Sequence, residues 1–167
     1  MKTIFFFAVN IFFSSITFGQ DFQFNKIPFN KIDSIQKSQG FEKFPYDYPI
    51  GVSEDYFPNR KKYRIEQPIV YRKNYRDYFV ETSFYLSSGD STIRLIEYWW
   101  RDTTYSLDFT DTIIAKNNII ISSFFKSKGK TYPKNKNHGD KTIWRNKFYY
   151  VQQFPVAEGL RVLISWK

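Results

Sequence analysis

Carboxylates are the side chains of this chain best suited to chemistry, and Glu97 is the foremost candidate. It lies in an alternating apolar run, between Leu95 and Trp99, where a carboxyl group partly shielded from water suits a general acid. Enzymes that hydrolyse glycans need two carboxylates. Glu81 is expected to face the other side of the same hairpin, so no catalytic pair is predicted. The favoured role for Glu97 is a salt bridge to an arginine or a sheet-edge position open to water.

The second catalytic candidate is His138, the single histidine of the chain. One histidine cannot make a multi-histidine zinc site, and the chain has no cysteine to complete one. His138 could act as a general base oriented by Asp140, but the surrounding residues 134–140 are typical of an exposed loop. Phosphate-binding, dinucleotide-binding and nucleophile-elbow motifs are absent from the sequence. No cofactor and no metal are therefore expected.

A candidate binding surface comes from Tyr85, Arg94, Tyr98 and Trp100, which the expected strand pairing places on one face of a hairpin. Aromatic rings beside a guanidinium group could stack on a sugar or pack on a partner protein. The Phe- and Tyr-rich segment that precedes the hairpin offers another explanation, because its side chains could cover this face. Coverage is the favoured interpretation.

These candidates are positioned by residues 78–100, two β-rich runs that flank a turn. A two-residue turn at Gly89–Asp90 predicts that Leu86 pairs with Ile93, Thr82 with Glu97 and Val80 with Trp99. A shift by one residue would set apolar side chains against polar ones, so the pattern favours this register.

Three further segments complete the predicted fold. Residues 147–153 and 160–166 both alternate and predict a second hairpin. Residues 108–128 carry one apolar helical stripe, although their isoleucines and paired asparagines also suit a hairpin; a helix is favoured. The prediction is an α+β fold, an antiparallel sheet of two hairpins with one helix packed on a face. An irregular amino-terminal arm, 20–67, precedes the domain at 68–167.

The first nineteen residues are typical of a signal peptide. Lys2 is followed by an apolar run from Ile4 to Phe13, about half the roughly 20 residues that a membrane-spanning helix needs. Thr17 and Gly19 fit the small-x-small pattern before a cleavage site, which predicts cleavage between Gly19 and Gln20. The protein is therefore expected in the periplasm or outside the cell.

Charge supplies the remaining functional indication, since the formal net charge is +9. Basic residues cluster at 60–76 and 126–147, which would attract an acidic glycan, an anionic membrane surface or another envelope protein. A solvated surface is the simpler interpretation, and no nucleic acid is expected. The leading hypothesis is a non-catalytic binding or structural envelope protein with a basic aromatic surface. The alternative is a carboxylate-dependent hydrolase that acts on an envelope or extracellular glycan.

Overall fold

A computed structural model describes residues 22–47, 50–65, 67–103, 107–133 and 140–167 of the chain. Within these residues the strands form one eight-stranded antiparallel sheet in the order β1-β2-β3-β4-β8-β7-β6-β5. This arrangement confirms the predicted α+β class. In the described part of the chain the sheet has more strands than two hairpins supply, and two α-helices replace the single one expected.

The strands are β1 (Glu42–Lys43), β2 (Ile69–Asn74), β3 (Tyr78–Leu86), β4 (Ile93–Asp102), β5 (Lys130–Tyr132), β6 (Lys141–Arg145), β7 (Tyr149–Val156) and β8 (Gly159–Trp166). The helices are α1 (Ile32–Ser38), which follows a 3-10 turn at Phe29–Lys31, and α2 (Leu107–Phe125). α2 is the helix predicted over 108–128. Among the described residues no helix is both long and apolar enough to pass through a bilayer.

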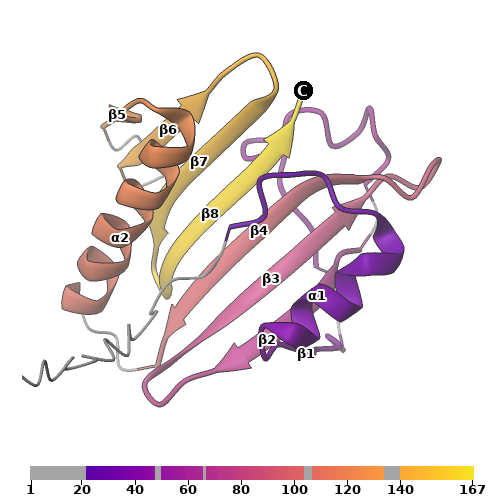
Figure 1. Cartoon of the computed structure of the whole chain (residues 1–167), viewed down its shortest axis with the longest axis horizontal. Coiled ribbons are helices and arrows are strands. Elements are labelled where there is room, and N and C mark those ends of the chain that lie inside the picture. Colours follow the sequence, from indigo (N-terminus) through magenta and orange to yellow (C-terminus); the bar gives the residue numbers. More distant parts are fainter. Residues whose placement is uncertain (1–21, 48–49, 66, 104–106, 134–139) are drawn as a thin grey trace, which may run out of the picture.

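The first face of the sheet carries the main hydrophobic core. Alternation along β3, β4 and β8 turns every second side chain to this face, where Phe84, Ile96 and Ile164 are fully buried. Both α-helices pack on it, and Figure 1 shows the start of the arm crossing the same face to reach α1. Phe22 of the arm meets Tyr98 edge to face, with 5.1 Å between the ring centroids. This face is therefore covered.

The second face of the sheet is mixed in character. A smaller apolar cluster crosses its middle, where the arm packs on the sheet: Val52, Phe57, Tyr85, Leu95, Phe154 and Leu163. Polar side chains of the central strands line two pockets on either side of this cluster. Candidate chemistry is thus concentrated on the second face.

The predicted register of the first hairpin is wrong by one residue along most of its length. Leu86 pairs with Ile93 as expected, but Arg94 is then an extra residue in β4, and Ser83 rather than Thr82 opposes Glu97. The shift arises at this bulge, because the pair next to the loop, Leu86 with Ile93, is the predicted one. The loop itself is wider than a two-residue turn: its left-handed residue is Ser91 (φ 51°), whose N–H donates to the carbonyl of Ser87 at 3.0 Å.

This bulge decides which carboxylates meet. With the predicted register Glu81 and Glu97 would point to opposite faces. The extra residue shifts the pairing by one, so that Glu81 opposes Trp99 and both carboxylates point to the second face.

Candidate functional site

The second face holds a pocket of about 420 Å³ whose polar lining converges from three strands and the arm. Its polar and aromatic lining residues are Tyr46, Glu81, Ser83, Tyr85, Glu97, Trp99, Arg101, Glu158 and Arg161, here called the polar cluster. Strand alternation explains the grouping, because residues two apart on β3 and on β4 point the same way. Arg161 joins them because it opposes Trp99 in the β4–β8 pairing.

Glu97 is buried, with 5% of its surface exposed, and both of its carboxylate oxygens have partners. Arg161 Nη1 lies 3.0 Å from Oε1, and the Tyr85 hydroxyl donates to Oε2 at 2.8 Å. Burial, reinforced by Glu97, raises the pKa of Tyr85 well above its ordinary value, so this hydroxyl keeps its proton. Of the two structural roles expected for Glu97, an arginine partner and an edge position open to water, the structure has the first.

Glu81 is the second carboxylate of the pocket and is equally enclosed, with 2% of its surface exposed. Arg72 Nε donates to it at 2.9 Å, and the Tyr46 hydroxyl donates at 2.6 Å. Glu81 and Glu97 are diagonal neighbours on adjacent strands, since one opposes Trp99 and the other Ser83. A pair of carboxylates, which the predicted register excludes, is therefore present in one pocket.

Arginine side chains and aromatic rings alternate across this face, in the order Phe44, Arg72, Phe79, Arg101, Trp99 and Arg161. Each step is a cation–π contact, which holds the guanidinium groups in place. The Trp99 ring has two of them, Arg101 at 4.3 Å and Arg161 at 3.9 Å from its centroid. The indole is therefore already engaged and is not a free platform for a sugar ring.

The polar cluster is balanced in charge once Arg72 is included. Arg72 pairs with Glu81, Arg161 with Glu97 and Arg101 with Glu158. Two buried donors, Trp99 Nε1 and Arg161 Nε, have no acceptor among the described residues. The cluster is therefore neutral in charge, and it encloses two donors that the protein does not pair.

The residues predicted to bind a ligand are not brought together. Tyr98 and Trp100 point to the first face and are buried under the arm. Tyr85 points to the second face and belongs to the polar cluster. Arg94, the bulge residue of β4, forms an ion pair with Asp90 in the loop that precedes the strand. His138 lies outside the described residues.

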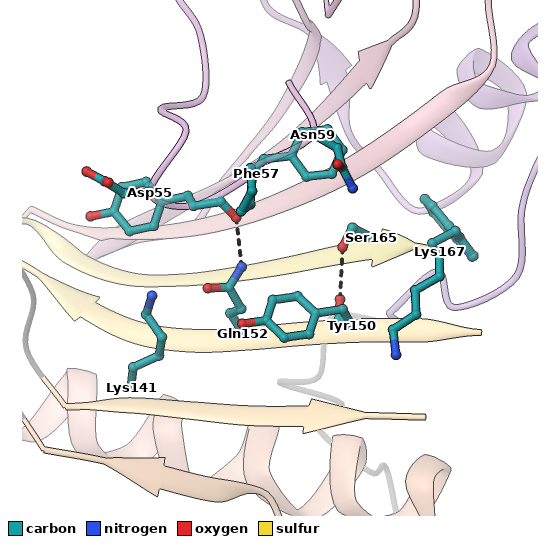
Figure 2. Close-up of a pocket in the computed structure, with 11 residues that line it drawn as sticks. Asp55, Phe57, Asn59, Lys141, Tyr150, Gln152, Ser165 and Lys167 are labelled. Atoms are coloured by element: carbon teal, nitrogen blue, oxygen red, sulfur yellow. Dashed lines mark hydrogen bonds between the residues drawn. The ribbon is translucent and has the colours of Figure 1, made fainter. Parts of the chain in front are cut away.

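A second, smaller pocket of about 250 Å³ lies between the arm and β6, β7 and β8, as Figure 2 shows. Tyr150 and Gln152 are on its sheet side, and Gln152 Nε2 donates to the carbonyl of Tyr56 at 2.8 Å. Burial lowers the pKa of Lys141 at its edge. The side-chain amide of Gln152 is therefore committed to the arm.

Sequence reasoning missed Glu81, Tyr46 and Arg161 as members of a site. The alternation of residues 160–166 does place Arg161 on the less apolar face of its strand. What the sequence lacks is a signal for the β4–β8 pairing, which joins residues 58 or more positions apart. Tyr46 is a residue of the irregular arm, where no helical or strand periodicity predicts which way a side chain points.

Alkaline pH should weaken the fold through Tyr46. Burial, followed by its hydrogen bond to Glu81, raises the pKa of Tyr46 to about 12. Between pH 10 and about 12 the folded protein therefore holds a proton that the unfolded chain has lost, and the free energy of unfolding falls as the pH rises. Tyr46→Phe should make this fall shallower, as measured by denaturant unfolding across that range. An unchanged slope would show that Tyr46 is not linked to stability.

Comparison of the chain with protein-family models, with curated proteins and with solved structures finds no match. The chemistry of the polar cluster is therefore the main indication of function.

Proposed function

We propose that this chain is an exported, non-catalytic binding protein that holds a saccharide unit of an envelope or extracellular glycan in the polar cluster. The observation that carries the proposal is the charge-balanced lining of a pocket of about 420 Å³. Carboxylates accept hydrogen bonds and guanidinium groups donate them, and a sugar hydroxyl can do both. A hydroxyl-rich ligand is therefore complementary to a lining that alternates the two.

Charged ligands fit this lining less well. An anion in the pocket would face Glu81, Glu97 and Glu158, and a cation would face the arginines that neutralise them. A charged ligand of either sign would also displace water from the pocket and leave either the carboxylates or the arginines of the lining without a partner. Neutral polyols avoid both costs, which is why a neutral sugar residue is proposed for this pocket even though the whole chain is basic.

Export remains part of the proposal and rests on the first nineteen residues, which lie outside the described part of the chain. A protein that leaves the cytoplasm with a site for hydroxyl-rich ligands would meet glycans at the cell surface. Mass spectrometry of the protein recovered after secretion tests this part, with an amino terminus at Gln20 as the expected result and retained residues 1–19 as the contrary one.

Glu158→Gln tests the site without removing a buried charge. Glu158 is at the pocket rim with 44% of its side chain exposed, and its substitution removes one acceptor and one charge. We expect affinity for the best neutral oligosaccharide of an immobilised panel to fall about ten-fold, or about 1.4 kcal/mol, in calorimetric titration. Glu54→Gln is the matched control, because Glu54 is 48% exposed and also pairs with one cation, Lys61, but does not line the pocket. Equal affinities for the two variants would contradict the assignment.

A hydrolase is the second candidate, because Glu81 and Glu97 share one pocket. Against it, Arg161 and Tyr85 occupy both oxygens of Glu97, and Glu81 is similarly held by Arg72 and Tyr46. Incubation of the protein with the oligosaccharide it binds distinguishes the two. Binding without release of reducing ends is expected; release that Glu97→Gln abolishes would establish the enzyme instead.

A further inference from the structure

A second surface, at the opposite side of the molecule from the turn that holds Glu158, combines aromatic side chains with unopposed positive charge. It is built from four segments, residues 22–27, 122–128, 144–149 and 165–167, here called the basic aromatic end. Figure 1 shows the end of α2, the β6–β7 turn and the carboxyl terminus of the chain at this same end of the sheet.

Direct contacts join these segments. Phe24 stacks on Phe124 at 3.9 Å between ring centroids, and Phe124 in turn meets Tyr149 edge to face at 5.3 Å. Trp166 Nε1 donates to the carbonyl of Phe24 at 3.1 Å. The N–H of Lys167 donates to the carbonyl of Phe148 at 3.0 Å. The arm, α2, the β6–β7 turn and β8 therefore form one continuous surface.

The side-chain charges of this surface have one sign. Its cations, all exposed, are Lys26, Lys126, Lys128, Arg145, Lys147 and Lys167. The four segments contain no aspartate or glutamate. None of the six cations forms an ion pair with a described residue. No acidic side chain of these segments therefore competes with an anionic partner for the six cations.

Apolar rings project from the middle of these cations. Phe148, at the β6–β7 turn, is 57% exposed, and Phe124 is 39% exposed. The ammonium group of Lys147 lies 4.7 Å from the Phe148 ring centroid, so charge and ring are adjacent at the tip of the turn. An exposed aromatic beside lysines is the arrangement found where proteins insert side chains at the boundary between headgroups and acyl chains.

We propose that the basic aromatic end binds the surface of an anionic lipid bilayer, with Phe148 inserted at the headgroup level and the lysines on the lipid phosphates. Soluble polyanions would be attracted by the same cations, but they offer no apolar layer for Phe148 and Phe124. The exposed rings are thus the feature that favours a membrane. This site is separate from the polar cluster, so the membrane proposal does not depend on glycan binding.

Sedimentation with lipid vesicles tests the proposal, using protein purified from cells that express the full chain. Vesicles of phosphatidylcholine with phosphatidylglycerol should bind the protein at low salt, and vesicles of phosphatidylcholine alone should bind it far less. Phe148→Ser should weaken binding to the anionic vesicles about ten-fold, and added salt should weaken it further. Circular dichroism checks that the variant is folded, which an exposed turn residue should permit.

Tyr75→Ser is the matched control, because Tyr75 is an exposed aromatic at the β2–β3 turn, beside Arg76, at the other end of the sheet. An equal loss of vesicle binding in both variants would overturn the proposal. So would an equal effect of Phe148→Ser on retention by a soluble acidic polysaccharide, since that result would indicate a contact with polyanions in general. A Phe148→Trp variant adds a positional readout: its fluorescence should be quenched by lipids that carry a quencher near the headgroup, and no quenching would place the residue outside the bilayer.

Discussion

Gly159→Ala should lower the free energy of unfolding by about 3 kcal/mol or more, one of the two largest effects expected of a single substitution in this chain. Gly159 opens β8 with a φ of 131°, a conformation that residues with a Cβ rarely adopt. A Cβ there would overlap the carbonyl oxygen of Trp100 and lie 3.1 Å from its carbonyl carbon. Because these are backbone atoms of the paired strand, relief requires β4 and β8 to separate.

Denaturant unfolding of Gly159→Ala measures this cost, and Gly89→Ala supplies the control. A Cβ at Gly89 would meet nothing within 4 Å, and its φ is not in the left-handed region. Gly89→Ala should therefore change stability by less than about 0.5 kcal/mol. If Gly159→Ala were as stable as Gly89→Ala, the β4–β8 junction at the centre of the sheet would have to differ from the one described.

Local alternation is the part of the fold that the sequence predicts well. Leu160, Val162 and Ile164 are all buried on the first face, as their spacing of two indicates. The second hairpin is longer than predicted, because β7 and β8 extend through Val156 and Gly159 and leave only two residues in the turn. Local pattern thus identifies the strands and the inner face of β8, but not where strands end, and in β4 the bulge turns the predicted inner residues Leu95 and Trp99 to the second face.

The bulge in β4 is where the prediction of the first hairpin failed, and the failure reached the site. A glycine followed by an aspartate is typical of a two-residue turn. In the structure Asp90 instead accepts from the N–H of Thr92 at 3.0 Å and pairs with Arg94 at 2.6 Å, which stabilises a wider loop. The loop keeps the predicted pair of Leu86 with Ile93, and the extra residue Arg94 makes the one-residue shift that brings Glu81 to the face of Glu97. A site on paired strands therefore depends on a bulge that the turn motif does not predict.

Long-range pairing is the other missing information. Arg161 reaches Glu97 only because β8 lies beside β4 rather than at an edge of the sheet. Tyr46 reaches Glu81 only because the arm folds back over the second face. Neither arrangement follows from periodicity. The long connections between these residues can close in many ways at similar entropic cost, so the sequence does not indicate which pairing forms.

Arg161→Met is the second substitution expected to have a large effect, a loss of about 3 kcal/mol in the free energy of unfolding. It leaves the buried carboxylate of Glu97 without its cation and removes the guanidinium group that lies 3.9 Å from the Trp99 ring centroid. Chemical denaturation compares it with Lys61→Met, which breaks the exposed pair of Lys61 and Glu54 and should cost less than about 0.5 kcal/mol. Similar losses in both variants would show that the Glu97–Arg161 pair behaves as a surface pair.

Replacing both partners separates stability from function in the polar cluster. Breaking a buried ion pair is costly because one charge is left alone, whereas replacement of both charges by apolar groups is often neutral. Glu97→Leu combined with Arg161→Met should therefore recover to within about 1 kcal/mol of the parent protein, although Tyr85 loses its acceptor. The same double variant should lose affinity for the neutral oligosaccharide about ten-fold or more, because an acceptor and a donor of the pocket are gone. Recovery of stability with loss of binding would show that the charges are retained for the ligand; a double variant that still bound the sugar would place the ligand elsewhere.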